Sequence, residues 1–167
     1  MTKQEEINQE PPARTLLLRT LAMPGDTNPA GDIFGGWIMS QMDIAGSLLA
    51  REIACGRVVT VAVDGMSFLK PVKVGNVVCC YGRCYKLGRT SITIELELWV
   101  KQLIADGDHE RVEKHMVTRA HYSYVKVNSQ GRPIPLPPEA SEIASRGIDA
   151  GRPCLGTGCD GDEGIIK

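Results

Sequence analysis

The stretch that decides the fold is residues 33–50, Ile33-Phe-Gly-Gly-Trp-Ile-Met-Ser-Gln-Met-Asp-Ile-Ala-Gly-Ser-Leu-Leu-Ala50. Its single ionisable side chain is the carboxylate of Asp43, and a buried carboxylate is costly unless it is paired or used chemically. Gly35 and Gly36, near the start, let a ligand approach backbone N–H groups, and a helix N-terminus there favours a developing negative charge. A lone acid downstream of an oxyanion-type helix start is therefore the main functional clue in the chain.

The same stretch predicts a helix over residues 36–54 that ends near Gly56, which suits a C-cap. Apolar side chains recur at three-to-four spacing and are expected to form its core face: Met39, Met42, Ala45, Leu49 and Ile53. The run barely reaches the length of a membrane span, and it contains Ser, Gln and Asp side chains. We therefore expect a central helix wrapped by other structure, and no membrane span.

The remaining segments have the patterns of β-strands, over residues 14–22, 57–63, 64–75 (short, turning at Pro71), 76–85, 90–100 and within 111–127. Residues 90–100 alternate strictly, with Ile92, Ile94, Leu96 and Leu98 on one side and Thr93, Glu95, Glu97 and Trp99 on the other. This alternation is typical of a half-buried antiparallel strand. One apolar helix among such strands requires a curled sheet around it, so we predict an α+β, hotdog-like fold.

Length and composition favour one domain with few special partners. The chain has 167 residues and a net charge of −1, which gives no sign of a nucleic-acid-binding face. Its six cysteines have no CxxC or zinc-like spacing, so we expect reduced thiols, a cytoplasmic protein and no metal site. We expect disorder over 1–11, one domain over 12–137, and a largely disordered tail over 138–167 with a short helix near 138–146.

Several linked motifs resemble the YciA group of bacterial acyl-CoA thioester hydrolases. They occur in the same order over residues 14–137, as Leu18-Arg-Thr-Leu-Ala-Met-Pro-Gly-Asp-Thr-Asn28, Gly31-Asp-Ile-Phe-Gly-Gly-Trp-Ile-Met-Ser-Gln-Met-Asp-Ile-Ala-Gly46, Gly56-Arg-Val-Val-Thr-Val-Ala-Val63, Phe68-Leu-Lys-Pro71, Gly75-Asn-Val-Val-Cys-Cys-Tyr81 and Gly88-Arg-Thr-Ser91. The resemblance implies a hotdog thioesterase acting on acyl-CoA, without a cofactor of its own, and homodimers that assemble as a trimer of dimers. By motif, Asp43 takes the place of the catalytic acid and the Gly35–Gly36 backbone that of the oxyanion hole. Asp32 stands where related thioesterases often carry Asn.

Thioester hydrolysis could use Asp43 as a general base to water or as a nucleophile that forms an anhydride, and the sequence does not choose between them. Eight residues of helix separate Gly35 from Asp43, roughly 10–12 Å at 1.5 Å per residue. Both cannot easily touch one thioester carbon, so we expect a site shared between two subunits. The structural alternative for Asp43 is pairing with Ser47 or with an arginine of a neighbouring chain.

Candidate contacts to coenzyme A lie in three places. Arg89, Thr90 and Ser91 follow a glycine turn and offer a guanidinium and two hydroxyls for phosphate. Lys70 is a further cation, with Ser67 and Phe68 as candidate lining of the pantetheine channel. Asn28 either contacts the ligand or holds a turn, and the turn is favoured. For each charged residue the alternative is a solvated surface charge.

Competing functions are a non-catalytic acyl-CoA binder or regulator, a hotdog dehydratase and a purely structural oligomer. A dehydratase usually needs a histidine beside its acid, and none occurs between residues 24 and 75. His115 and His121 lie six residues apart on the last strand and are expected to share a face, without a Gly-x-Ser-x-Gly elbow. We therefore expect neither a catalytic histidine nor a cysteine nucleophile.

Overall fold

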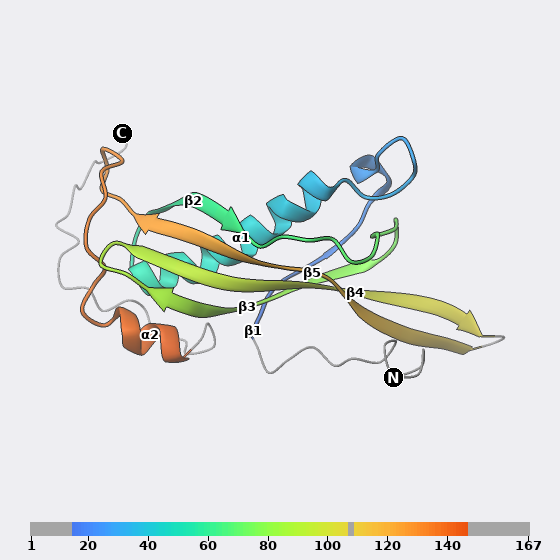
Figure 1. Ribbon diagram of the computed structural model, residues 1–167. Helices are drawn as coiled ribbons and strands as arrows, with labels where there is room; N and C mark the ends of the chain where they lie inside the picture. The colour runs from blue at the N-terminus through green and yellow to red at the C-terminus, as the bar shows by residue number, and fades with distance from the viewer. Residues whose placement is uncertain (1–14, 107–108, 147–167) are drawn as a thin grey trace, which may run out of the picture.

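A computed structural model describes residues 15–106 and 109–146 of the chain. They form a curved sheet, one long helix and two short helical segments (Figure 1). The elements, in chain order, are β1 (Thr15–Leu21), η1 (Pro24–Asp26), α1 (Gly35–Ala54), β2 (Val58–Asp64), β3 (Val77–Leu87), β4 (Ser91–Asp106), β5 (His109–Lys126) and α2 (Ala140–Arg146). No helix within these two ranges is long and apolar enough to span a bilayer.

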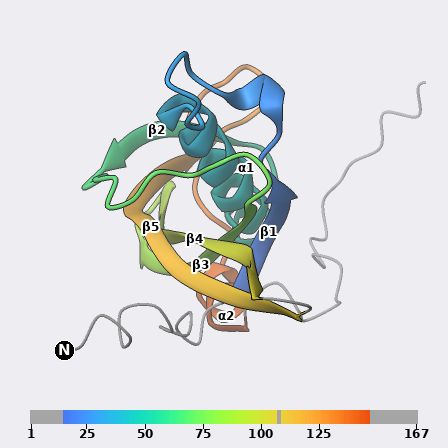
Figure 2. The ribbon, with the colours of Figure 1, turned by 90° about the vertical axis from the view of Figure 1, so that its right-hand side faces the viewer.

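The five strands form one antiparallel sheet in the order β1-β3-β4-β5-β2, so β1 and β2 are its edges. The sheet curls around α1, which lies in its concave face (Figure 2). This arrangement confirms the α+β, hotdog-like prediction. It follows from α1 being apolar on much of its surface, because a curved sheet covers such a helix from several sides.

The buried face of helix α1 agrees with the predicted core face except at one position. Ile38, Met42, Ala45, Leu49 and Ile53 are buried. The expectation for Met39 was wrong, because its side chain is 39% exposed and Ile38 takes its place. At 3.6 residues per turn, residues 38, 42, 45, 49 and 53 lie on one face of the helix. Residue 39 lies about 100° further around the helix than residue 38 and so points away from the centre of that face.

Helix α1 ends at Ala54, as predicted, and begins at Gly35, one residue before the predicted start, but its C-cap differs from the prediction. Cys55, not Gly56, is the left-handed C-cap, with φ 46°, and its N–H bonds to the carbonyls of Arg51 and Glu52. The predicted strand over 64–75 was also wrong beyond Asp64: this segment is a loop whose single β-bridge joins Lys73 to Asp32. That loop forms one wall of the pocket described below.

Strand β4 buries both of its faces. Ile92, Ile94, Leu96 and Leu98 face α1 with no exposed surface, as predicted. The acids on the other face are buried as well, which the half-buried interpretation did not anticipate. Glu97 accepts hydrogen bonds from Trp99 Nε1 at 3.1 Å and Arg119 Nε at 2.7 Å, so its burial is offset by partners.

A β-bulge in the β4–β5 pair changes which residues share a face. His121 pairs with Glu95 on the outer face, whereas His115 pairs with Val100, a member of the inner core, and the register shifts between Leu98 and Trp99. Cross-strand partners lie on the same side of a sheet. The expectation that the two histidines share a face was therefore wrong, because period-two counting fails across an extra residue.

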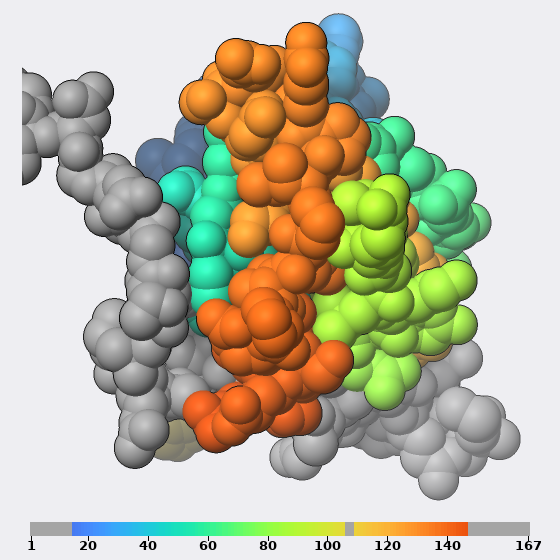
Figure 3. Space-filling model, turned by 90° about the vertical axis from the view of Figure 1, so that its left-hand side faces the viewer, coloured from blue at the N-terminus to red at the C-terminus, as the bar shows by residue number. Residues whose placement is uncertain are grey.

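The segment after β5 covers one end of the molecule. Figure 3 shows residues 128–146 in orange across this face, next to the lime-green turn between β3 and β4. The N–H of Leu136 bonds to the carbonyl of Arg89 at 2.9 Å, and Ala140 of α2 is buried against the core. The short helix predicted near 138–146 is confirmed as α2. The expectations of disorder over 1–11 and toward the end of the tail lie outside the described residues.

Candidate active site

Asp43 lies in the middle of α1, half-buried, and its carboxylate is held by two strands. Its Oδ1 accepts a hydrogen bond from Thr60 Oγ1 of β2 at 2.7 Å. Tyr124 Oη of β5 lies 3.2 Å from the same Oδ1 and 3.1 Å from the main-chain carbonyl oxygen of Asp43. Within residues 15–106 and 109–146, Oδ2 receives no hydrogen bond, so one carboxylate oxygen is anchored and the other is left for chemistry.

The structural alternative of a bond between Asp43 and Ser47 was wrong. Ser47 Oγ instead donates to the carbonyl of Ile44 at 2.8 Å. Sequence reasoning missed both Thr60 and Tyr124. A signal for Tyr124 was present, because a tyrosine on the core-facing side of a strand usually needs a partner for its hydroxyl.

The start of α1 offers unused N–H groups. Its N-cap is Phe34, which supplies no side-chain cap, and the first turn holds no acidic residue. The N–H groups of Gly35 and Gly36 have no acceptor among the residues that the structure describes. These donors and the positive end of the helix dipole suit an anion or a developing oxyanion.

The two glycines at this start have different surroundings. A Cβ added to Gly35 would lie 3.3 Å from the ring of Phe68, whereas one added to Gly36 would meet nothing within 4 Å. Gly35 therefore lets Phe68 lie against the helix start, and Gly36 faces open space. Eight residues of one helix separate Gly35 from Asp43, which corresponds to about 12 Å.

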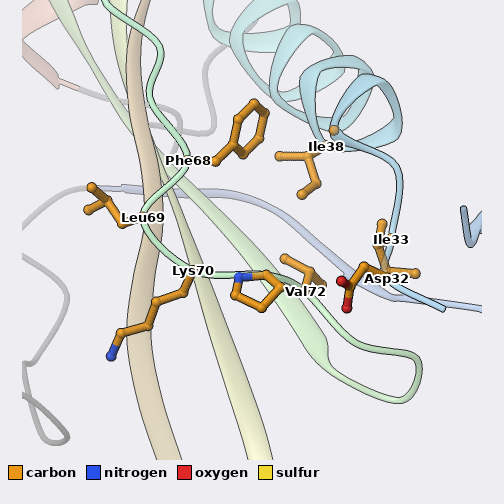
Figure 4. A pocket seen from close by; sticks show the side chains of 9 residues that line it. Asp32, Ile33, Ile38, Phe68, Leu69, Lys70 and Val72 are labelled. Carbon is orange, nitrogen blue, oxygen red and sulfur yellow. The ribbon is translucent and has the colours of Figure 1, made fainter. Parts of the chain in front are cut away.

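A pocket of about 360 Å³ opens beside this helix start (Figure 4). Its lining is mostly apolar: Asp32, Ile33, Gly35, Ile38, Phe68, Leu69, Lys70, Pro71 and Val72. In Figure 4 the side chain of Lys70 extends away from Asp32, toward the outside. An apolar slot with a cation at its rim and free N–H groups beside it suits a ligand with an apolar arm and an anionic head.

Asp32 and Asn28 organise the loop before α1. Asn28 Oδ1 accepts hydrogen bonds from the N–H groups of Ala30 at 2.9 Å and Asp32 at 3.1 Å, which confirms the turn interpretation. The carboxylate of Asp32 forms an ion pair with Lys73, across the single bridge between the two loops. In this structure Asp32 thus joins the loop before α1 to the loop after β2.

The remaining predicted residues lie elsewhere. Arg89, Thr90 and Ser91 form the β3–β4 turn, where the carbonyl of Thr90 accepts from the N–H of Lys126 at 2.9 Å. Because Lys126 pairs with Val58, at the start of β2, this turn lies by the C-terminal end of α1. Ser67 is exposed and does not line the pocket. One chain therefore brings together Asp32, Gly35, Phe68 and Lys70, but not Arg89, Thr90 and Ser91.

The histidines make no hydrogen bond to Asp43. The ring of His121 lies 4.6 Å from that of Tyr85, and burial, with Lys70 nearby, lowers the pKa of His115. In the described part of the chain, no group of three or more His, Cys, Asp or Glu side chains could hold a metal ion.

Comparison with known proteins gives concordant results. Residues 30–104 match the family model of the thioesterase superfamily. The chain is 59% identical over 126 residues to acyl-CoA thioester hydrolase YciA of Salmonella typhimurium, covering 75% of this chain and 92% of that protein. It is 56% identical over 128 residues to the Escherichia coli K12 protein of the same name, covering 77% and 95%.

Solved structures agree with these matches. A hexameric broad specificity acyl-coenzyme A thioesterase superposes with a TM-score of 0.73 at 53% identity, over 83% of this chain and 93% of the other. A hexameric thioesterase from Yersinia pestis gives 0.69 at 57% identity, over 77% and 99%.

Proposed function

The chain belongs to the thioesterase superfamily, and we propose that it hydrolyses acyl-CoA thioesters to coenzyme A and a carboxylic acid at a site built on Asp43. The observation that carries the assignment of the site is the anchored carboxylate. Oδ1 of Asp43 accepts hydrogen bonds from the hydroxyl groups of Thr60 and Tyr124, which leaves Oδ2 to act on water or on the thioester. No cofactor is required for this chemistry, because the carboxylate, water and backbone N–H groups supply every function it needs.

Two routes use the same carboxylate. As a general base, Oδ2 takes a proton from water while the water oxygen bonds to the carbonyl carbon; the C–S bond then breaks and the thiolate of coenzyme A leaves and is protonated. As a nucleophile, Oδ2 itself bonds to that carbon and expels the thiolate, and water hydrolyses the resulting anhydride. In both routes the carbonyl oxygen gains negative charge, which the N–H groups of Gly35 and Gly36 are placed to accept. Removal of one such donor typically costs about 10²–10³ in rate.

We assign the two halves of this chemistry to different subunits. Gly35 and Asp43 are about 12 Å apart along one helix, so the N–H group of Gly35 and the carboxylate of Asp43 in one chain are too far apart to act on one carbonyl. Strand β2 is a free edge of the sheet, and Val61 on it is 57% exposed. An exposed apolar edge strand is a template for pairing with another chain. Pairing of β2 with the same strand of a second copy gives a homodimer as the minimal active unit, with the hexamer as a trimer of dimers.

The same assembly accommodates the separated candidates for coenzyme A. Two antiparallel β2 strands run in opposite directions, so the β3–β4 turn of one copy approaches the helix start of the other. We assign the pantetheine arm to Phe68 and Ser67, and the phosphates to Lys70 with Arg89, Thr90 and Ser91 of the second copy. Asn28 and Asp32 hold the loop at the entrance. Cys79, Cys80 and Cys84 form no disulfide bond within the described residues, which supports a reducing, cytoplasmic compartment.

The test is hydrolysis of acyl-CoAs from short to long chain, with thiol release followed colorimetrically. Asp43→Asn, which keeps the shape of the side chain, should lower kcat by at least about 10³-fold, of the order found when a catalytic group is removed. Glu52→Gln on the same helix is the matched control and should keep wild-type rates. Equal rates in wild type and Asp43→Asn would refute the site. Binding of coenzyme A without hydrolysis in wild type would instead support the non-catalytic binder.

A further inference from the structure

The hydroxyl of Tyr124 reaches two oxygens of one residue. Oη lies 3.1 Å from the main-chain carbonyl oxygen of Asp43 and 3.2 Å from its Oδ1. The tyrosine side chain has no exposed surface. A single donor placed between the main chain and the carboxylate of the same residue restricts rotation of that side chain. Thr60 approaches the same Oδ1 from β2, so the carboxylate is fixed from two strands.

Gly46 provides the space for this hydroxyl. It lies in the interior of α1, where glycine is unfavourable relative to alanine. A Cβ at this position would overlap Tyr124 Oη, and it would lie 3.1 Å from Tyr124 Cζ and 3.0 Å from Leu96 Cδ1. The glycine is therefore explained by the close approach of the tyrosine, one helical turn from Asp43.

A second tyrosine on the same strand serves as an internal comparison. Tyr122 Oη donates to the carbonyl of Met39 at 3.0 Å, one helical turn before Asp43. The two rings stack with their centroids 6.4 Å apart, and both side chains are buried. Both tyrosines thus tie β5 to α1, but only Tyr124 touches the carboxylate. Any effect peculiar to Tyr124 comes from that contact.

Tyr124 can act on the carboxylate only as a donor. Burial raises its pKa far above the ordinary value of 10.0, and the negative charge of Asp43 and the hydrogen bond to it raise it further. The hydroxyl therefore keeps its proton at every pH at which the enzyme would work. The hydroxyl protons of Tyr124 and Thr60 both occupy Oδ1 through hydrogen bonds, so Oδ2 is the oxygen that can react.

We propose that Tyr124 is a positioning residue, which selects the rotamer of Asp43 in which Oδ2 faces the thioester, with Gly46 as the residue that makes its approach possible. This inference rests on the proposed role of Asp43 as the catalytic acid. It predicts that loss of one hydroxyl, whose hydrogen-bond partners in the described residues are oxygens of Asp43, lowers the rate of the chemical step without weakening the binding of substrate.

The test compares Tyr124→Phe with Tyr122→Phe, each of which removes one buried hydroxyl from the same face of β5. Tyr124→Phe should lower kcat by about 10–100-fold and leave KM within about twofold, because hydrogen bonds to charged groups are the stronger class. Tyr122→Phe should leave both within about twofold. Thermal unfolding of the two variants shows whether they lose similar stability, and therefore whether the difference in kcat has a structural origin.

The split between kcat and KM supplies a readout that a purely structural role does not give. A general loss of packing would act in both phenylalanine variants, because each loses one buried hydroxyl between β5 and α1. Loss of the contact with Oδ1 lowers kcat, with KM retained, in Tyr124→Phe alone.

The outcomes separate this inference from the proposed function. If Asp43→Asn abolishes hydrolysis while the two phenylalanine variants are indistinguishable in kcat and in KM, the catalytic acid stands and the positioning role is overturned. If Asp43→Asn retains activity, both are overturned, because Tyr124 would then have no catalytic group to position. A loss of kcat with an unchanged KM in Tyr124→Phe alone is the expected result.

Discussion

Replacing Gly46 with alanine should destabilise the protein, although alanine is the better helix former. The added methyl group would overlap the hydroxyl of Tyr124 and press on Leu96 Cδ1 at 3.0 Å. All three residues are buried, and Leu96 belongs to the core layer of β4 that faces α1. The methyl group therefore cannot be accommodated by a side chain that moves into solvent.

The magnitude follows from three opposing effects. Overpacking a core costs about 1–3 kcal/mol. Displacing a buried tyrosine hydroxyl from its acceptors costs about 1–3 kcal/mol more. The gain in helix propensity from glycine to alanine offsets about 1 kcal/mol. The net loss is about 1–5 kcal/mol, and its midpoint of about 3 kcal/mol corresponds to a fall in Tm of roughly 6–12 °C for a chain of this size.

The assay is unfolding in urea, monitored by circular dichroism at one protein concentration, on a double-mutant cycle of Gly46→Ala and Tyr124→Phe. The substitution Gly46→Ala should cost about 1 kcal/mol less in the Tyr124→Phe background, because the overlapping hydroxyl is gone. Gly36→Ala, whose added methyl group meets nothing within 4 Å, is the control and should be neutral or stabilising. Wild-type stability of Gly46→Ala, or the same loss in both backgrounds, would refute the packing argument.

Three further outcomes follow from other parts of the structure. Gly35→Ala places a methyl group 3.3 Å from the ring of Phe68, so it should raise KM for acyl-CoA severalfold with little change in Tm; steady-state kinetics with an unchanged KM would contradict this. The pKa of Cys80 is about 12 when folded and 9.0 when exposed, so the folded state binds the proton more tightly and its stability falls as pH rises from 9 to 12. Urea midpoints across this range should fall less steeply for Cys80→Ala than for wild type, and equal slopes would count against the assignment. Glu97→Ala leaves the indole N–H of Trp99 without its acceptor and should cost about 2–3 kcal/mol in urea unfolding; a loss below about 0.5 kcal/mol would show that another acceptor replaces it.

The sequence was sufficient for the architecture because the strongest patterns are also the buried ones. The alternation from Ile92 to Leu98 and the apolar helix after Gly35 leave few ways to bury both, and the observed fold is one of them. Errors arose where local geometry departs from a fixed period. The register shift between Leu98 and Trp99 places His115 on the inner face, and the left-handed C-cap of α1 is Cys55 and not Gly56.

The site was predictable only in part, for a related reason. Asp43 and the glycines stand out in the sequence because a carboxylate and glycine residues are both unfavourable within an apolar helix. The partners of Asp43 come from positions 60 and 124, and neither pattern nor spacing connects these positions to residue 43. Only the curl of the sheet brings β2 and β5 to the same turn of α1.

Thr60 lies on β2, so this edge strand has two roles. The strand whose Thr60 donates a hydrogen bond to the carboxylate of Asp43 is also an edge strand of the sheet. Substitutions intended to block subunit association would therefore also disturb catalysis if they altered the path of the strand near residue 60. Val61 is exposed and next to Thr60, so a proline at this position would disturb the backbone that holds Thr60 in reach of Asp43. A lysine there would keep that backbone and would oppose the second copy of the dimer that we propose.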